Sequence, residues 1–155
     1  MSSLTKTSSI AASSFVQQES RVASRGRVAR IGLATVIAAV AANTLIYFIG
    51  GALVAYDPQF LPLANVSGEI VFTLPAAIGA VLLYAALLRL TRTPARLFTI
   101  IAAVVFVVTL IPLFTYIPTV PGVTGGQTAI LVLMHITAAG VIVRMLTTLT
   151  RLQAR

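Results

Sequence analysis

Residues 97–117 read LFTIIAAVVFVVTLIPLFTYI, a stretch that is rich in β-branched residues and contains no charged side chain. A helix needs about 20 apolar residues to cross the roughly 30 Å hydrocarbon core of a bilayer, and this stretch has that length. Because lipid offers the backbone no hydrogen-bond partner, a helix is the only conformation that we expect for it. The stretch therefore predicts a transmembrane helix.

Three further apolar stretches of similar length flank it, at residues 31–54, 70–88 and 128–149. The first two contain no charge, whereas His135 and Arg144 interrupt the third. We therefore expect an all-α membrane protein with four transmembrane helices in an up-down bundle. The transmembrane domain is predicted to cover residues 31–150, followed by a short C-terminal segment over residues 151–155.

The composition excludes an ordinary soluble domain and most catalytic chemistry. Apolar residues make up 58% of the 155 residues and charged residues 9%, with a mean hydropathy of +1.01, whereas a typical soluble domain has about 25% charged residues. The absence of cysteine excludes disulfides, thiolate metal sites and cysteine nucleophiles. One histidine and three acidic residues leave little material for an active site, so we expect no enzyme and no cofactor.

Charge predicts the orientation of the bundle in the membrane. The eleven Lys and Arg residues fall before the first span, between the second and third spans, and around the C-terminal end, whereas the other two loops contain none. The positive-inside rule then places both termini and the middle loop in the cytoplasm.

Most of these basic residues border the predicted spans, which favours anionic lipid headgroups over nucleic acid as their partner. The border residues are Arg27, Arg30, Arg89, Arg92, Arg96 and Arg144.

Residues 1–30 are rich in Ser and Thr, with scattered Arg and one acidic residue. They have too little apolar surface to drive packing, so we expect a mostly disordered cytoplasmic tail. Two alternatives involve processing. The Ser/Arg-rich composition is also typical of an organellar transit peptide, and the residues that end at Asn43 imitate a secretory cleavage site.

Polar residues inside the predicted spans are the natural candidates for function, because they are costly in lipid. Asn43 and Tyr47 share one helix face, and His135 is the only histidine. They are interpreted either as packing contacts or as a polar site for a solute or proton. A lone histidine makes no metal site, because stable sites need three or four ligands. Glu69 is explained by the helix start at which it stands, with Ser67 as the expected cap.

Several short motifs resemble those of the family named domain of unknown function 6069. They are A-N-x-x-x-Y at Ala42 to Tyr47, Leu-Leu-Arg-Leu at Leu87 to Leu90, T-R-T-P-A-R directly after it, and L-M-H-I-T-A-A at Leu133 to Ala139. The resemblance covers roughly residues 27–149. It implies a small four-helix protein of a bacterial inner membrane. The family has no assigned activity, so it implies no catalytic residue.

Two classes of function remain after these exclusions. The first is a non-catalytic structural or accessory subunit, which fits the small polar inventory and the short loops. Four spans can bury only limited surface alone, so we also expect a homo-oligomer or a larger membrane complex. The second is a small oligomeric transporter or channel, which would use Asn43, Tyr47 and His135.

Overall fold

The computed structural model describes the backbone of residues 3–153 and the side chains of residues 26–148. Every regular element in this part of the chain is a helix. In chain order these are α1 (Ser3–Leu53), α2 (Leu61–Ala64), α3 (Val66–Leu90), α4 (Pro94–Thr115), the 3₁₀ helix η1 (Ile117–Thr119) and α5 (Gly125–Gln153).

Four of these helical segments are long and apolar enough to cross a membrane. They cover Gly26–Leu53, Val66–Leu90, Pro94–Thr119 and Gly125–Thr148. Each includes most of one predicted span and begins a few residues before it. The all-α fold with four candidate spans is therefore confirmed.

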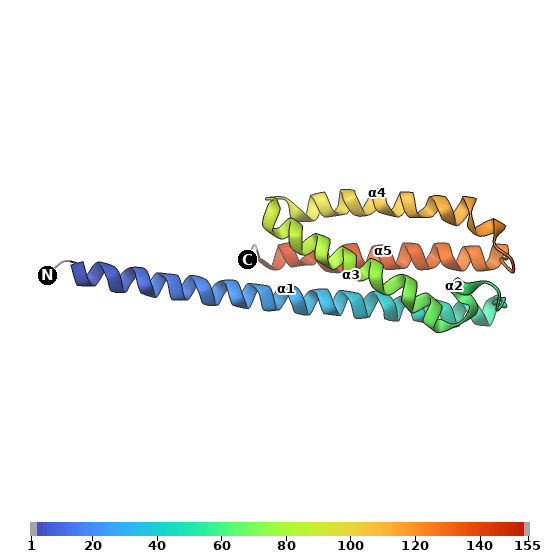
Figure 1. Ribbon diagram of the computed structural model, residues 1–155, viewed down its shortest axis with the longest axis horizontal. Coiled ribbons are helices and arrows are strands. Elements are labelled where there is room, and N and C mark those ends of the chain that lie inside the picture. Colours follow the sequence, from blue (N-terminus) through green and yellow to red (C-terminus); the bar gives the residue numbers. More distant parts are fainter. Residues whose placement is uncertain (1–2, 154–155) are drawn as a thin grey trace.

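The four long helices form an up-down-up-down bundle in which neighbours along the chain run antiparallel (Figure 1). α1 packs on α3, α3 on α4 and α4 on α5, and α5 returns to pack on α1. The start of the first span, the α3–α4 turn and the end of α5 therefore lie together, at what we call the basic end. α2 and η1 lie at the other end, which we call the distal end.

Helix α1 extends well beyond the bundle at the basic end (Figure 1). Helix α1 runs without a break from Ser3, and the mostly disordered tail expected for residues 1–30 stays a prediction. No proline stands in this segment and its first glycine is Gly26, so nothing in the local sequence ends the helix. The prediction of disorder rested on the small apolar surface that the tail can bury, which is a separate matter from helix formation. Residues 1–2 and 154–155 lie outside the described residues.

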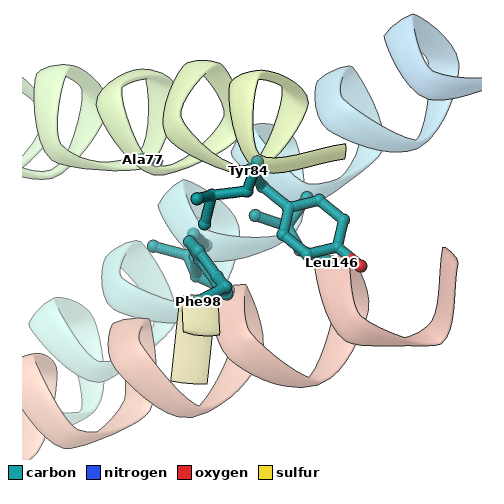
Figure 2. Packing of buried hydrophobic residues seen from close by; sticks show 7 residues of the cluster. Ala77, Tyr84, Phe98 and Leu146 are labelled. Atoms are coloured by element: carbon teal, nitrogen blue, oxygen red, sulfur yellow. The ribbon is translucent and has the colours of Figure 1, made fainter. Parts of the chain in front are cut away.

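The interior of the bundle consists of two apolar clusters. The cluster towards the basic end contains Tyr84, whose ring packs edge-on against Phe98 with 5.0 Å between ring centroids (Figure 2). Its other buried members are Ala39, Ala77, Leu87, Ile142 and Leu146. The distal cluster is formed by Phe60, Leu63, Leu113, Leu131 and Met134.

The two long helices that start at the distal end, α3 and α5, are capped by side chains. Asn65 caps α3 by accepting a hydrogen bond from the backbone N–H of Gly68 at 3.0 Å. Ser67 was expected in this role, but its hydroxyl donates to the Asn65 side chain instead. At α5, Thr124 and Gln127 form a reciprocal capping box, in which each side chain accepts from the backbone N–H of the other residue.

Candidate functional site: a buried polar network between α1 and α3

The six arginines expected at the membrane borders are all exposed. Arg27 and Arg30 lie at the start of the first span, and Arg89 lies in the last turn of α3. Arg92 and Arg96 follow in the turn and at the start of α4, while Arg144 is about one turn from the end of the fourth span. All six therefore gather towards the basic end (Figure 1).

The three residues proposed as a polar cluster find their hydrogen-bond partners elsewhere. Asn43 is buried, with 4% of its surface exposed, whereas Tyr47 and His135 are half-buried. His135 lies with Nδ1 3.0 Å from the carbonyl oxygen of Leu131, one turn earlier in α5. The Tyr47 ring lies against Tyr56, with centroids 5.1 Å apart. Among the described side chains, no hydrogen bond joins Asn43, Tyr47 and His135.

Asn43 instead belongs to a network that fastens α1 to α3. Its Nδ2 donates to the Thr73 hydroxyl at 3.1 Å, and that hydroxyl donates to Glu69 Oε1 at 3.0 Å. Thr44, the next residue of α1, donates its hydroxyl to Glu69 Oε2, also at 3.0 Å. We call these four residues the Glu69 network.

The direction of each hydrogen bond in the network follows from the chemistry of its groups. An amide nitrogen only donates, so the Thr73 oxygen accepts from Asn43 and has its single proton left for Glu69. The carboxylate therefore accepts from two hydroxyl groups, one on each helix.

The Glu69 network lies in the interior. Glu69 is 4% exposed and Thr73 is 8% exposed. Along α1, Asn43 follows Ala39 of the basic-end cluster and precedes Tyr47, which packs on the distal cluster. The network therefore separates the two apolar clusters.

Charge and hydrogen bonding in the network are not fully balanced. Among the side chains that the structure describes, no Lys or Arg forms an ion pair with Glu69, and the border arginines gather towards the basic end. The Asn43 Oδ1 atom is buried and has no hydrogen-bond partner within residues 26–148. Leaving such an acceptor unpaired costs about 1–3 kcal/mol. Both features mark the network as the candidate functional site.

Sequence reasoning singled out Asn43 but missed its partners. Glu69 was explained by the helix start, and Thr44 and Thr73 drew no attention. One signal was present, because Glu69 and Thr73 are four residues apart and therefore share a helix face. The pairing with Asn43 and Thr44 depends on the register between α1 and α3, which the sequence of either helix alone does not contain.

A second polar contact lies at the distal end and joins Tyr56, which follows the first span, to Tyr47 within it. The Tyr56 hydroxyl donates to the backbone oxygen of Tyr47 at 2.9 Å. Burial raises the pKa of Tyr56, and the neighbouring Tyr47 raises it further. This hydrogen bond holds the loop that follows α1 against α1 itself.

The donor set for metal chemistry is small. Within residues 26–148, no three His, Cys, Asp or Glu side chains come together as metal ligands. The only acidic side chain of the network is Glu69, and its other oxygens come from threonine and asparagine. The arrangement thus places one carboxyl group, two hydroxyl groups and one amide side by side between α1 and α3.

Comparison with curated proteins and with solved structures gives no match for this chain. A family profile does match, over residues 23–151, and it describes a family of unknown function, DUF6069. The match covers all four candidate spans and the Glu69 network. The chain therefore belongs to the family of unknown function DUF6069, as its motifs indicated.

Proposed function

We propose that the protein is a non-catalytic integral membrane protein that serves as a structural or accessory subunit of a bacterial inner-membrane assembly. The observation that carries this proposal is that the polar groups in the interior of the bundle bind one another across two helices. Asn43 binds Thr73 and Thr44 binds Glu69, so both side-chain contacts fasten α1 to α3. Apolar clusters fill the bundle on both sides of them. A closed scaffold of this kind interacts with partners through its outer surface.

The polar groups near the distal end support a role without catalysis. The Asp57 carboxylate accepts from the backbone N–H of Gln59 at 2.8 Å and so stabilises a turn. Ser67 donates to the cap of α3, and His135 bonds within its own helix. Each group thus serves local structure, whereas nucleophilic catalysis needs a nucleophile and a base within hydrogen-bond reach of each other.

The exposed arginines support an orientation with the basic end in the cytoplasm. Positively charged loops stay on the cytoplasmic side during insertion. In this orientation both termini are cytoplasmic, and the arginines at the border interact with anionic lipid headgroups. The distal end, with Asp57 and Glu69, then faces away from the cytoplasm.

The exposed face of helix α4 is where we expect a partner subunit to dock. It has the smallest share of buried residues among the four spans. Its buried side chains are Pro94, Phe98 and Leu113, whereas Val108 and its neighbours on α4 are more than half exposed. A neighbouring transmembrane helix would find its largest uncovered surface here.

The second candidate function is a small oligomeric transporter or channel. The buried Glu69 carboxylate and the unpaired Asn43 Oδ1 favour it, because polar groups inside a membrane mark solute and ion paths. Its expected residues are Asn43, Tyr47 and His135. If it is right, His135→Ala abolishes flux in reconstituted vesicles and leaves the fold intact, and unchanged flux removes the role of His135.

Native mass spectrometry of the tagged protein, purified gently from its host in nanodiscs, separates the two candidates. A stoichiometric companion protein is the expected result. Val108→Trp on α4 should then lose the companion, whereas the matched variant Ile136→Trp, on the similarly exposed face of α5, should keep it. A monomer or a pure homo-oligomer would contradict the accessory role and favour transport.

A further inference from the structure

We propose that the Glu69 network binds a single monovalent metal cation, with the oxygen atoms of Glu69, Asn43, Thr44 and Thr73 as its ligands. This inference goes beyond the proposed function and holds for an accessory subunit as well as for a transporter. It starts from the protons of the network.

The hydrogen bonds within the Glu69 network use both threonine hydroxyl protons and one proton of the Asn43 amide. The two threonine hydroxyls donate to Glu69, and the Asn43 amide nitrogen donates to Thr73. What remains is the second proton of the Asn43 amide nitrogen and a set of lone pairs on the carboxyl group, on the two hydroxyl oxygens and on Asn43 Oδ1. A ligand that completes this set must itself be positive or must donate hydrogen bonds.

The unpaired Asn43 oxygen is the second, independent sign of such a ligand. Asn43 is 4% exposed, and its Oδ1 has no partner among the described residues although its Nδ2 is hydrogen-bonded within the network. Both atoms belong to one amide group, so Oδ1 also lies beside the network. A bound cation would satisfy this oxygen and offset the buried carboxylate at the same time.

The chemistry of the ligands selects the kind of cation. Carboxylate, carbonyl and hydroxyl oxygens are hard ligands, which suit alkali and alkaline-earth ions and not the softer transition metals. Calcium sites usually combine several carboxylates, whereas this network has one. One negative charge matches a monovalent ion, and sodium is the probe that we choose.

Glu69 must supply the attraction for the cation, because the N-terminus of α3 disfavours positive charge. The carboxylate stands near the N-terminus of α3, where the helix dipole favours anions and disfavours cations. Binding should therefore depend on the charge of Glu69 more than on any other group of the network. A neutral side chain of the same shape should abolish it.

The test measures binding of radioactive sodium to the purified full-length protein in nanodiscs, in choline chloride buffer of constant ionic strength. We expect about one sodium ion per protein, and thermal unfolding at a higher temperature in sodium chloride than in choline chloride, because a ligand stabilises the state that binds it. Glu69→Gln should lose both effects. Asp57→Asn, which removes a carboxylate outside the network, should keep both.

A milder pair of variants covers the case in which Glu69→Gln fails to fold. Thr44→Val removes one oxygen from a half-buried position, and Thr44→Ser retains it. The valine variant should bind sodium about tenfold more weakly, which corresponds to about 1.4 kcal/mol, and the serine variant should bind it normally. The proposal is overturned by sodium binding that survives in Glu69→Gln, by equal unfolding temperatures in the two salts, or by calcium displacing sodium at a lower concentration.

Discussion

Thr73 is the residue through which the amide of α1 reaches the carboxylate of α3. Its hydroxyl accepts from Asn43 and donates to Glu69. Thr73→Val keeps the shape of the side chain but leaves the buried Asn43 amide without its partner. We expect a loss of about 1–3 kcal/mol in the free energy of unfolding, measured by thermal or denaturant unfolding in detergent.

The control for this prediction is Thr109→Val on α4. The Thr109 hydroxyl is exposed and bonds only to the Phe106 oxygen of its own helix, so its loss should change the free energy of unfolding by no more than about 0.5 kcal/mol. Equal effects of the two substitutions would show that the Glu69 network contributes nothing to the stability of the bundle.

We expect Tyr56 to make the free energy of unfolding depend on pH in the alkaline range. Burial and the neighbouring Tyr47 raise its pKa above the usual 10.0. The folded protein then holds the phenol proton more tightly than the unfolded chain does, so the contribution of Tyr56 to the free energy of unfolding falls as the pH rises above 10. Tyr56→Phe should be less stable than the wild type at neutral pH, and this difference should shrink above pH 10.

The comparison for this titration is Tyr116→Phe, because the Tyr116 side chain is 65% exposed. Its difference from the wild type should stay small and constant over the same pH range, as followed by thermal unfolding. A stability difference for Tyr56→Phe that grows with pH would contradict the direction assigned to its pKa.

At the residue scale, the sequence predicted which polar residue is buried better than it predicted the hydrogen-bond partner of that residue. The polar residue Asn43 was expected to face the bundle, and it does. Its partner Thr73 was not predicted, because a hydrogen bond between helices depends on their register, and many registers suit two uniformly apolar helices.

At the scale of elements, close contact between α1 and α3 near the basic end depends on Gly32. A Cβ atom at this position would lie 2.6 Å from Val81 Cγ1, which is closer than atoms normally approach. Gly32→Leu should therefore force the two helices apart and cost about 1–3 kcal/mol. The readout is the midpoint of thermal unfolding in detergent.

Gly79 on α3 provides a matched glycine, because a Cβ atom there would meet nothing within 4 Å. Gly79→Leu should leave the midpoint unchanged or raise it, since glycine is a poor helix former. A larger loss for Gly79→Leu than for Gly32→Leu would contradict the packing described for α1 and α3.

The existence of the four long helices was predictable from the sequence, because an apolar run of membrane length has few alternatives. Their ends were less predictable. The cap of α3 is Asn65 and not Ser67, and α1 continues back to Ser3. Capping depends on local backbone geometry, and the continuation of α1 depends on the absence of a helix breaker. Neither changes the hydropathy on which the prediction rested.

At the scale of the whole molecule, the order of the helices followed from their number and short loops, since antiparallel neighbours are the simplest arrangement for consecutive spans. Orientation in the membrane is a separate matter that rests on the arginines. Because the chain contains no cysteine, single introduced cysteines report on it directly.

The measurement that tests the account most directly is labelling of single cysteines in intact cells with a membrane-impermeant maleimide. Gln59→Cys and Thr119→Cys lie at exposed positions of the distal end, and Arg92→Cys lies in the α3–α4 turn. The account predicts that the first two are labelled in intact cells and the third only after the membrane is permeabilised. Labelling of Arg92→Cys in intact cells, or disagreement between the two distal positions, would contradict the four-span bundle with a cytoplasmic basic end.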